Sequence, residues 1–153
     1  MLNKIIDILL VEDNLDDVEI TKRALKQAKV INNLHVVRDG QEAIDFLFRQ
    51  GEYRDKTDLP NPGLILLDIN MPRLNGVEVL KRLKENGVLK HIPVIMLTVS
   101  KRDEDIVRSY RYGCNSFIQK PVDFDKFVEL VKELGLYWGL LNVSCSEENC
   151  GSL

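Results

Sequence analysis

The sequence has no apolar run long enough to cross a membrane, and its start lacks a secretory signal. A membrane-spanning helix needs about 20 consecutive apolar residues, and polar or turn-forming residues interrupt every apolar stretch well before that length. Asp7 breaks the apolar stretch near the amino terminus, and no small-residue cleavage site follows it. We therefore predict a cytoplasmic protein without a membrane partner.

An excess of positive charge is also missing. The chain carries 21 Lys and Arg residues against 24 Asp and Glu residues, a net charge of −3, whereas nucleic-acid phosphates are bound by clustered basic residues. We therefore expect no nucleic-acid partner. Internal repeats and linkers are absent too, so the 153 residues are expected to form one domain. The stretch after Leu134 is too short for a helix-turn-helix output module.

Metal-binding patterns of cysteine and histidine are lacking as well. Cys114, Cys145 and Cys150 do not have zinc-site spacing, and we interpret them as free thiols in a reducing cytosol. The alternative for Cys145 and Cys150 is a cross-link that forms on oxidation. His35 and His91 have no partner at a recognisable metal-ligand spacing, so we expect structural or surface roles for both.

What the sequence does contain is a short apolar run, residues 63–67, that ends on Asp68. Such a run is typical of a strand buried on both faces of a parallel sheet. Open α/β sheets bind ligands just beyond the carboxyl ends of their strands, which makes Asp68 a candidate functional residue. Taken alone, an Asp at this point can also be an ordinary loop-starting residue.

Four further segments have the composition of strands, namely residues 5–11, 34–37, 93–97 and 116–119. Helical patterns follow the strands, the first after Asn14 and the others over residues 43–48, 77–83, 103–112 and 124–134. Ile106, Val107 and Tyr110 are expected to face inward from the fourth helix. Five strands alternating with five helices predict a parallel α/β sheet covered on both faces through right-handed crossovers. Residues 49–62 form a loop that is long for this kind of connection.

Polar residues end four of these strands: Glu12 and Asp13, Asp68, Thr98, and Lys120. The carboxyl ends of parallel strands lie on one edge of the sheet, so these groups should converge there. Carboxylates placed so close together repel unless a cation joins them, and Mg²⁺ is the natural cation for oxygen ligands. A lysine and a hydroxyl beside the metal suit a phosphoryl group.

Each residue also has a simpler interpretation when it is considered alone. Lys120 could be a solvated lysine at a strand end, and Thr98 could cap the next segment. Glu12 and Asp13 could be acids near the positive end of the first helix. The convergence of four groups on one sheet edge favours the functional interpretation.

Together these motifs resemble the receiver domain of two-component response regulators. The resemblance covers roughly residues 5–134 and includes the Glu-Asp pair, the Asp before Met71-Pro72 and Asn75-Gly76, the Thr and the Lys-Pro pair. It implies a doubly wound, flavodoxin-like sheet with strand order 2-1-3-4-5, as in the chemotaxis regulator. We further expect a receiver domain over residues 1–141 and a flexible C-terminal tail over residues 142–153.

The resemblance assigns the phosphoacceptor and the metal ligands. It implies that Asp68 takes the phosphoryl group and that Mg²⁺ is held by Asp13, Asp68 and the backbone carbonyl of Asn70. Glu12 would act through a coordinated water molecule.

The resemblance also assigns the residues that respond to the phosphoryl group. Lys120 pairs first with Asp68 and then with the phosphoryl oxygens. Thr98 reorients its hydroxyl onto that group, and Phe117 is the aromatic switch residue, although an aromatic in a strand is expected to belong to the core in any case. The Lys120–Pro121 bond falls where the family often has a cis peptide.

The implied function is that of a stoichiometric phosphoacceptor for a sensor histidine kinase or a phosphotransfer protein, rather than a turnover enzyme. Such a protein promotes its own phosphorylation and dephosphorylation and signals through a changed surface. A haloacid-dehalogenase-like phosphatase would need an acid where Asn70 stands. A receiver-like module that is never phosphorylated usually lacks an acid or the lysine, and this chain keeps them all.

The apolar residues 134–141 and the loop around residues 51–54 suggest a subgroup. They look like the regulators that serve bacterial phytochrome kinases, which dimerise through the last two helices and the fifth strand. A homodimer is therefore expected, with Tyr137 and Trp138 as interface anchors. The alternative is that the apolar segment folds back onto the core.

Overall fold

The computed structural model describes residues 6–27, 32–56, 58–110 and 116–133. Within these ranges the strands are β1 (Ile6–Val11), β2 (Asn32–Val37), β3 (Leu64–Asp68), β4 (Val94–Thr98) and β5 (Ser116–Gln119). The α-helices are α1 (Leu15–Gln27), α2 (Gly40–Phe48), α3 (Gly76–Glu85), α4 (Lys101–Tyr110) and α5 (Phe124–Glu133). All strand pairs are parallel, and the order is β2-β1-β3-β4-β5. The predicted fold class and strand order are confirmed.

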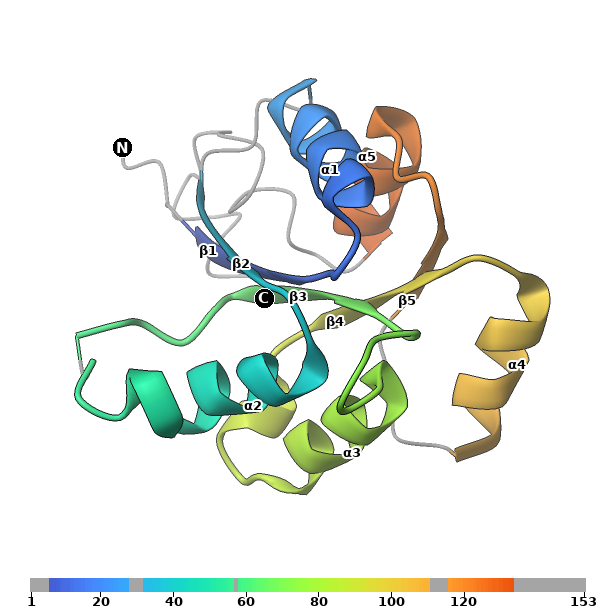
Figure 1. The fold of residues 1–153 in the computed structure, drawn as a ribbon. Coiled ribbons are helices and arrows are strands. Elements are labelled where there is room, and N and C mark those ends of the chain that lie inside the picture. The colour runs from blue at the N-terminus through green and yellow to red at the C-terminus, as the bar shows by residue number, and fades with distance from the viewer. Residues whose placement is uncertain (1–5, 28–31, 57, 111–115, 134–153) are drawn as a thin grey trace, which may run out of the picture.

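The sheet separates two apolar cores. Helices α1 and α5 cover one face, and α2, α3 and α4 lie on the other (Figure 1). Side chains alternate along the strands, so Ile8 and Leu10 of β1 pack toward α1 and α5, while Leu9 and Val11 pack toward α2 and α3. This two-sided burial explains why the inner strands are continuous apolar runs rather than alternating patterns.

Helices α2 and α3 begin at side-chain caps that fix the loops near the strand ends. The Asp39 carboxylate accepts a hydrogen bond from the Glu42 backbone N–H, and the Asn75 side chain accepts one from Glu78 in the same way. Gly76 follows this second cap, and its N–H donates to the Ile69 carbonyl at 2.8 Å. A side chain would not fit there, because a Cβ on Gly76 would lie 2.2 Å from the Asp68 carbonyl oxygen.

Several local details differ from the sequence-based expectations. Strand β2 starts two residues before the predicted 34–37, and α4 starts two residues before the predicted Asp103. Ile106, expected to face inward, is 41% exposed, whereas Val107 is buried. Adjacent side chains of an α-helix point in different directions, so when Val107 faces the core, Ile106 lies at the side of the helix. The short 3₁₀ helices η1 (Gly51–Tyr53) and η2 (Leu89–His91) were not predicted, since single turns carry no hydrophobic period.

Some predictions lie outside the described residues. These are the three cysteines, the apolar segment 134–141 and the tail 142–153. None of the helices in the described part of the chain combines the length and apolar character that a membrane span requires.

Candidate functional site

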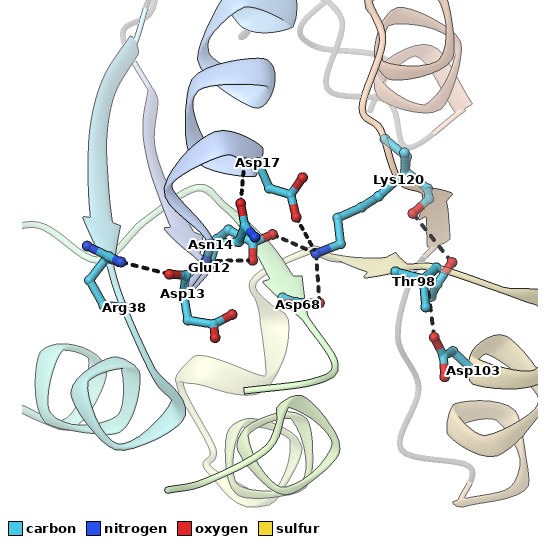
Figure 2. A network of polar contacts seen from close by, with 11 residues as sticks. Glu12, Asp13, Asn14, Asp17, Arg38, Asp68, Thr98, Asp103 and Lys120 are labelled. Carbon is cyan, nitrogen blue, oxygen red and sulfur yellow. Dashed lines mark hydrogen bonds and ion pairs between the residues drawn. The ribbon is translucent and has the colours of Figure 1, made fainter. Parts of the chain in front are cut away.

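The predicted polar residues meet at the carboxyl edge of the sheet (Figure 2). Val11, the last residue of β1, pairs with Leu67 of β3. Glu12 and Asp68 are the residues that follow these two, so they lie side by side. Both side chains are almost fully buried, with residue exposures of 0% and 3%. Lys120 follows β5 directly, and only 10% of its side chain is exposed. Charged groups withdrawn from water to this extent need partners.

The Lys120 ammonium group is the centre of the polar network. Its Nζ lies 3.0 Å from Glu12 Oε1, 3.0 Å from Asp17 Oδ2 and 3.4 Å from Asp68 Oδ1. Figure 2 shows the lysine side chain reaching across the edge of the sheet to these groups from β1, α1 and β3. An ammonium has three N–H donors, so each carboxylate can accept one of them.

Residues of the β1–α1 loop hold two of these carboxylates in place. The Asn14 side chain accepts a hydrogen bond from the Asp17 backbone N–H at 3.0 Å, which makes Asn14 the predicted cap of α1. The Asn14 backbone N–H in turn donates to Glu12 Oε2 at 3.3 Å. The Glu12 carboxylate is therefore bound on one side by the loop and on the other by Lys120.

Burial and neighbouring charges shift the pKa values of Glu12, Asp68 and Lys120. Burial raises the pKa of Glu12 to about 7, with the nearby Asp68 carboxylate adding to the rise and Lys120 opposing it. Burial also raises the pKa of Asp68 above its ordinary value, although Lys120 and the Asn70 backbone N–H lower it in part. For Lys120, burial lowers the pKa, but the hydrogen bonds to Glu12 and Asp17 outweigh it and leave the pKa raised. The lysine therefore stays charged at neutral pH.

The acids at this edge fit a hard divalent cation. Glu12, Asp13 and Asp68 each offer a carboxylate oxygen, and these oxygens lie within 4.8 Å of one another. An all-oxygen set is what Mg²⁺ and Mn²⁺ accept. Arg38 steadies this loop, because its Nη2 donates to the Asp13 backbone carbonyl at 2.7 Å. Asn70 lies two residues after Asp68 with its side chain exposed, and its role as a carbonyl ligand stays a prediction.

Thr98 and Phe117, the predicted switch residues, occupy neighbouring strands. The buried Thr98 hydroxyl donates to the Ile118 carbonyl at 3.5 Å, and the Lys120 backbone N–H donates to the Thr98 carbonyl at 2.6 Å. The Phe117 ring is half-buried and lies under the Arg108 guanidinium, 4.5 Å from the ring centroid. The predicted cis peptide at Lys120–Pro121 is confirmed.

Asp17 is a member of the network that the sequence did not reveal as a site residue. Asp17 is one of two acids in the first turn of α1, a placement that the positive end of a helix favours without any function. Its position, the third residue after the cap Asn14, is a local signal for a capping role and not for a contact with Lys120. The Asp39–Arg73 ion pair, 2.9 Å long, was also not predicted. It joins the start of α2 to the loop that follows Asp68.

Comparisons with known proteins match most of the chain to one family. The family model described as the response regulator receiver domain matches residues 8–132 of this chain. The response regulator Rcp1 of Synechocystis sp. is 38% identical over 131 residues, which are 86% of this chain and 87% of Rcp1. The structure of the bacteriophytochrome response regulator AtBRR is 44% identical, has a TM-score of 0.82 and covers 91% of this chain and 99% of its own.

Two further solved structures contain a metal or a phosphoryl group. The Mn²⁺-bound form of Rcp1 is 37% identical, with a TM-score of 0.70. The phosphorylated cyanobacterial phytochrome response regulator RcpA is also 37% identical, with a TM-score of 0.71. Each covers 88% of this chain and 94% of its own.

Proposed function

The chain belongs to the response regulator receiver domain family, and from this premise we propose that Asp68 accepts a phosphoryl group from a sensor histidine kinase. The observation that carries the proposal is the surroundings of Asp68. It is a buried carboxylate at the end of the central strand, with an ammonium at 3.4 Å and two further acids within metal-sharing distance. The similarity to phytochrome-associated regulators, expected from the sequence, is confirmed.

The proposed step is an in-line displacement at phosphorus. An Asp68 carboxylate oxygen forms the new O–P bond, the bond from phosphorus to the donor histidine nitrogen breaks, and the electron pair leaves with that nitrogen. The Lys120 ammonium, already beside Asp68, then neutralises a phosphoryl oxygen. Asp13, Asp68, the Asn70 carbonyl and, through a water molecule, Glu12 would hold Mg²⁺, which when bound would supply charge neutralisation for the transferring group.

The signal would pass from the phosphoryl group to β4 and β5. Thr98 exchanges its long hydrogen bond to the Ile118 carbonyl for a shorter, charge-assisted one to a phosphoryl oxygen. Its movement vacates space that the half-buried Phe117 ring can enter. A local charge change would in this way alter the exposed surface of β5 and α4.

The proposal extends to partners. The phosphoryl donor would be a phytochrome-type sensor histidine kinase or a phosphotransfer protein, and the protein would be located in the cytoplasm. We further propose a homodimer through α4, β5, α5 and the apolar segment 134–141. In this role the protein is consumed and regenerated stoichiometrically while it promotes its own phosphorylation and dephosphorylation.

Intact mass after incubation with acetyl phosphate tests the central step. We expect the gain of one phosphoryl group in the presence of Mg²⁺ and none in EDTA. Asp68→Asn should abolish the gain, whereas Asp16→Asn, which removes the same charge from an exposed position on α1, should leave it intact. A phosphoryl group retained by Asp68→Asn would contradict the assignment. No gain under any condition would favour a binding module that is never phosphorylated.

A further inference from the structure

The Lys120 ammonium is shared unequally among its three carboxylates. It lies 3.0 Å from both Glu12 and Asp17 but 3.4 Å from Asp68. The group that must serve the phosphoacceptor is therefore held nearer to α1 and the β1 loop than to the phosphoacceptor itself. We infer that Asp17 is a positioning residue that holds Lys120 back from Asp68 and thereby slows phosphoryl transfer. This inference rests on the proposed function.

Asp17 differs from the other acids of the site. Glu12, Asp13 and Asp68 form the cluster whose oxygens can share a cation, and Asp17 lies outside it. Its hydrogen bond with Lys120 joins residues 103 positions apart in the sequence. The Asp17 carboxylate therefore acts on the lysine rather than as a member of the metal-binding cluster.

The Asp17 contact is better defined than an ordinary surface ion pair. Its carboxylate is 28% exposed and the lysine 10%. On the same helix, Glu19 and Lys22 are 65% and 47% exposed and lie 3.8 Å apart. The Asn14 side chain accepts a hydrogen bond from the Asp17 backbone N–H, so the Asp17 carboxylate is presented to Lys120 from the capped start of the helix. Such a placement favours a defined role for the contact.

The inference follows from counting donors. The ammonium has three N–H groups, and Glu12, Asp17 and Asp68 occupy the three. An incoming phosphoryl group offers new oxygens, and one present partner must release its N–H before Lys120 can donate to them. Since Asp17 is the most exposed of the three partners, water can replace the lysine there most readily. The strength of the Asp17 contact therefore opposes the bond that Lys120 makes to the phosphoryl group.

Asp17→Asn tests this, with Asp16→Asn as the matched control. Both residues are acids in the first turn of α1, so both variants lose the same charge at the helix start, but only Asp17 contacts Lys120 among the described interactions. At saturating Mg²⁺ we expect Asp17→Asn to raise the rate of phosphorylation by acetyl phosphate about two- to fivefold, the range for loss of a partly exposed ion pair. Asp17→Glu, which keeps the charge, should restore the slower rate.

A second measurement does not depend on phosphorylation. The Lys120 ammonium resonance, followed by NMR in EDTA, should shift in Asp17→Asn and not in Asp16→Asn. Equal rates in the two variants, or a slower rate in Asp17→Asn, would overturn the inference. An unchanged Lys120 resonance in Asp17→Asn would overturn it as well. If even the wild type takes up no phosphoryl group, the proposed function fails, and the resonance alone still reports whether Asp17 holds the lysine.

Discussion

Gly76→Ala should displace the backbone that carries Asp68 without contacting any functional side chain of the site. The added Cβ would lie 2.2 Å from the Asp68 carbonyl oxygen and 2.9 Å from Ile69 Cα, where ordinary contacts begin at 3.4 Å. The opposing atoms are backbone, so the start of α3 and the end of β3 must separate by about 1 Å to restore normal packing.

The expected loss of stability follows from that overlap. Overpacking of this kind costs about 1–3 kcal/mol, which for a chain of this length lowers the melting temperature by roughly 2–4 °C per kcal/mol. In an unobstructed helix the same change would instead stabilise the protein, by about 0.5–1 kcal/mol. The sign of the effect therefore tests the packing directly.

Two assays measure the consequences of Gly76→Ala. Thermal denaturation should show the lower melting temperature, and phosphorylation by acetyl phosphate should slow by up to about 100-fold, the effect of a 1 Å misplacement of a reacting group. Gly87→Ala is the control, since a Cβ there meets nothing within 4 Å, and we expect a change of no more than about 0.5 kcal/mol. A Gly76→Ala protein as stable as the wild type would refute the close approach of α3 to Asp68.

Three further predictions concern other parts of the site. Asp39→Ala removes the cap of α2 together with the Arg73 ion pair and should lower the free energy of unfolding, measured by urea denaturation, by about 1–2 kcal/mol. Arg73→Ala removes only the ion pair and should lower it less, so equal losses would mean that the cap contributes nothing. Because the folded protein holds a proton on Glu12 up to about pH 7, against 4.5 for an ordinary Glu, stability in EDTA from this group is fully present below pH 4.5 and is lost as the pH rises through 7. Melting temperatures in EDTA should therefore fall between pH 5 and 8, and a flat profile would argue against a buried, protonated Glu12. Arg108→Ala uncovers the Phe117 ring and should cost about 0.5 kcal/mol while shifting the ring resonances in NMR, and unchanged resonances would count against the contact.

The features of the site that follow from the sheet topology could be predicted from the sequence. Once five alternating strands and helices are recognised, the carboxyl ends of the strands must share an edge, so the meeting of Glu12, Asp68 and Lys120 could be foreseen from residues that lie far apart in the chain. Strand order and cis geometry at Pro121 followed from the family resemblance.

Details that depend on the phase of a helix could not be foreseen. Whether Ile106 or Val107 faces the core is set by how α4 is rotated on the sheet, and adjacent apolar residues leave that rotation open. The contact of Asp17 with Lys120 depends on the angle at which α1 leaves β1. No local pattern encodes that angle, because the lysine arrives from the far end of the domain.

The Lys120 contacts also have a consequence for folding. The hydrogen bond to Glu12 spans 108 residues, and that to Asp17 spans 103, so each closes a chain loop that includes most of the domain, and the entropy cost of closing a loop rises with its length. Parallel sheets assembled from such distant segments acquire these contacts only when most of the chain is in place. A nascent chain that has not yet reached β5 presents clustered acids without their counter-charge. Under the proposed function, the site at Asp68 is therefore complete only once the last strand has docked and brought Lys120 beside it.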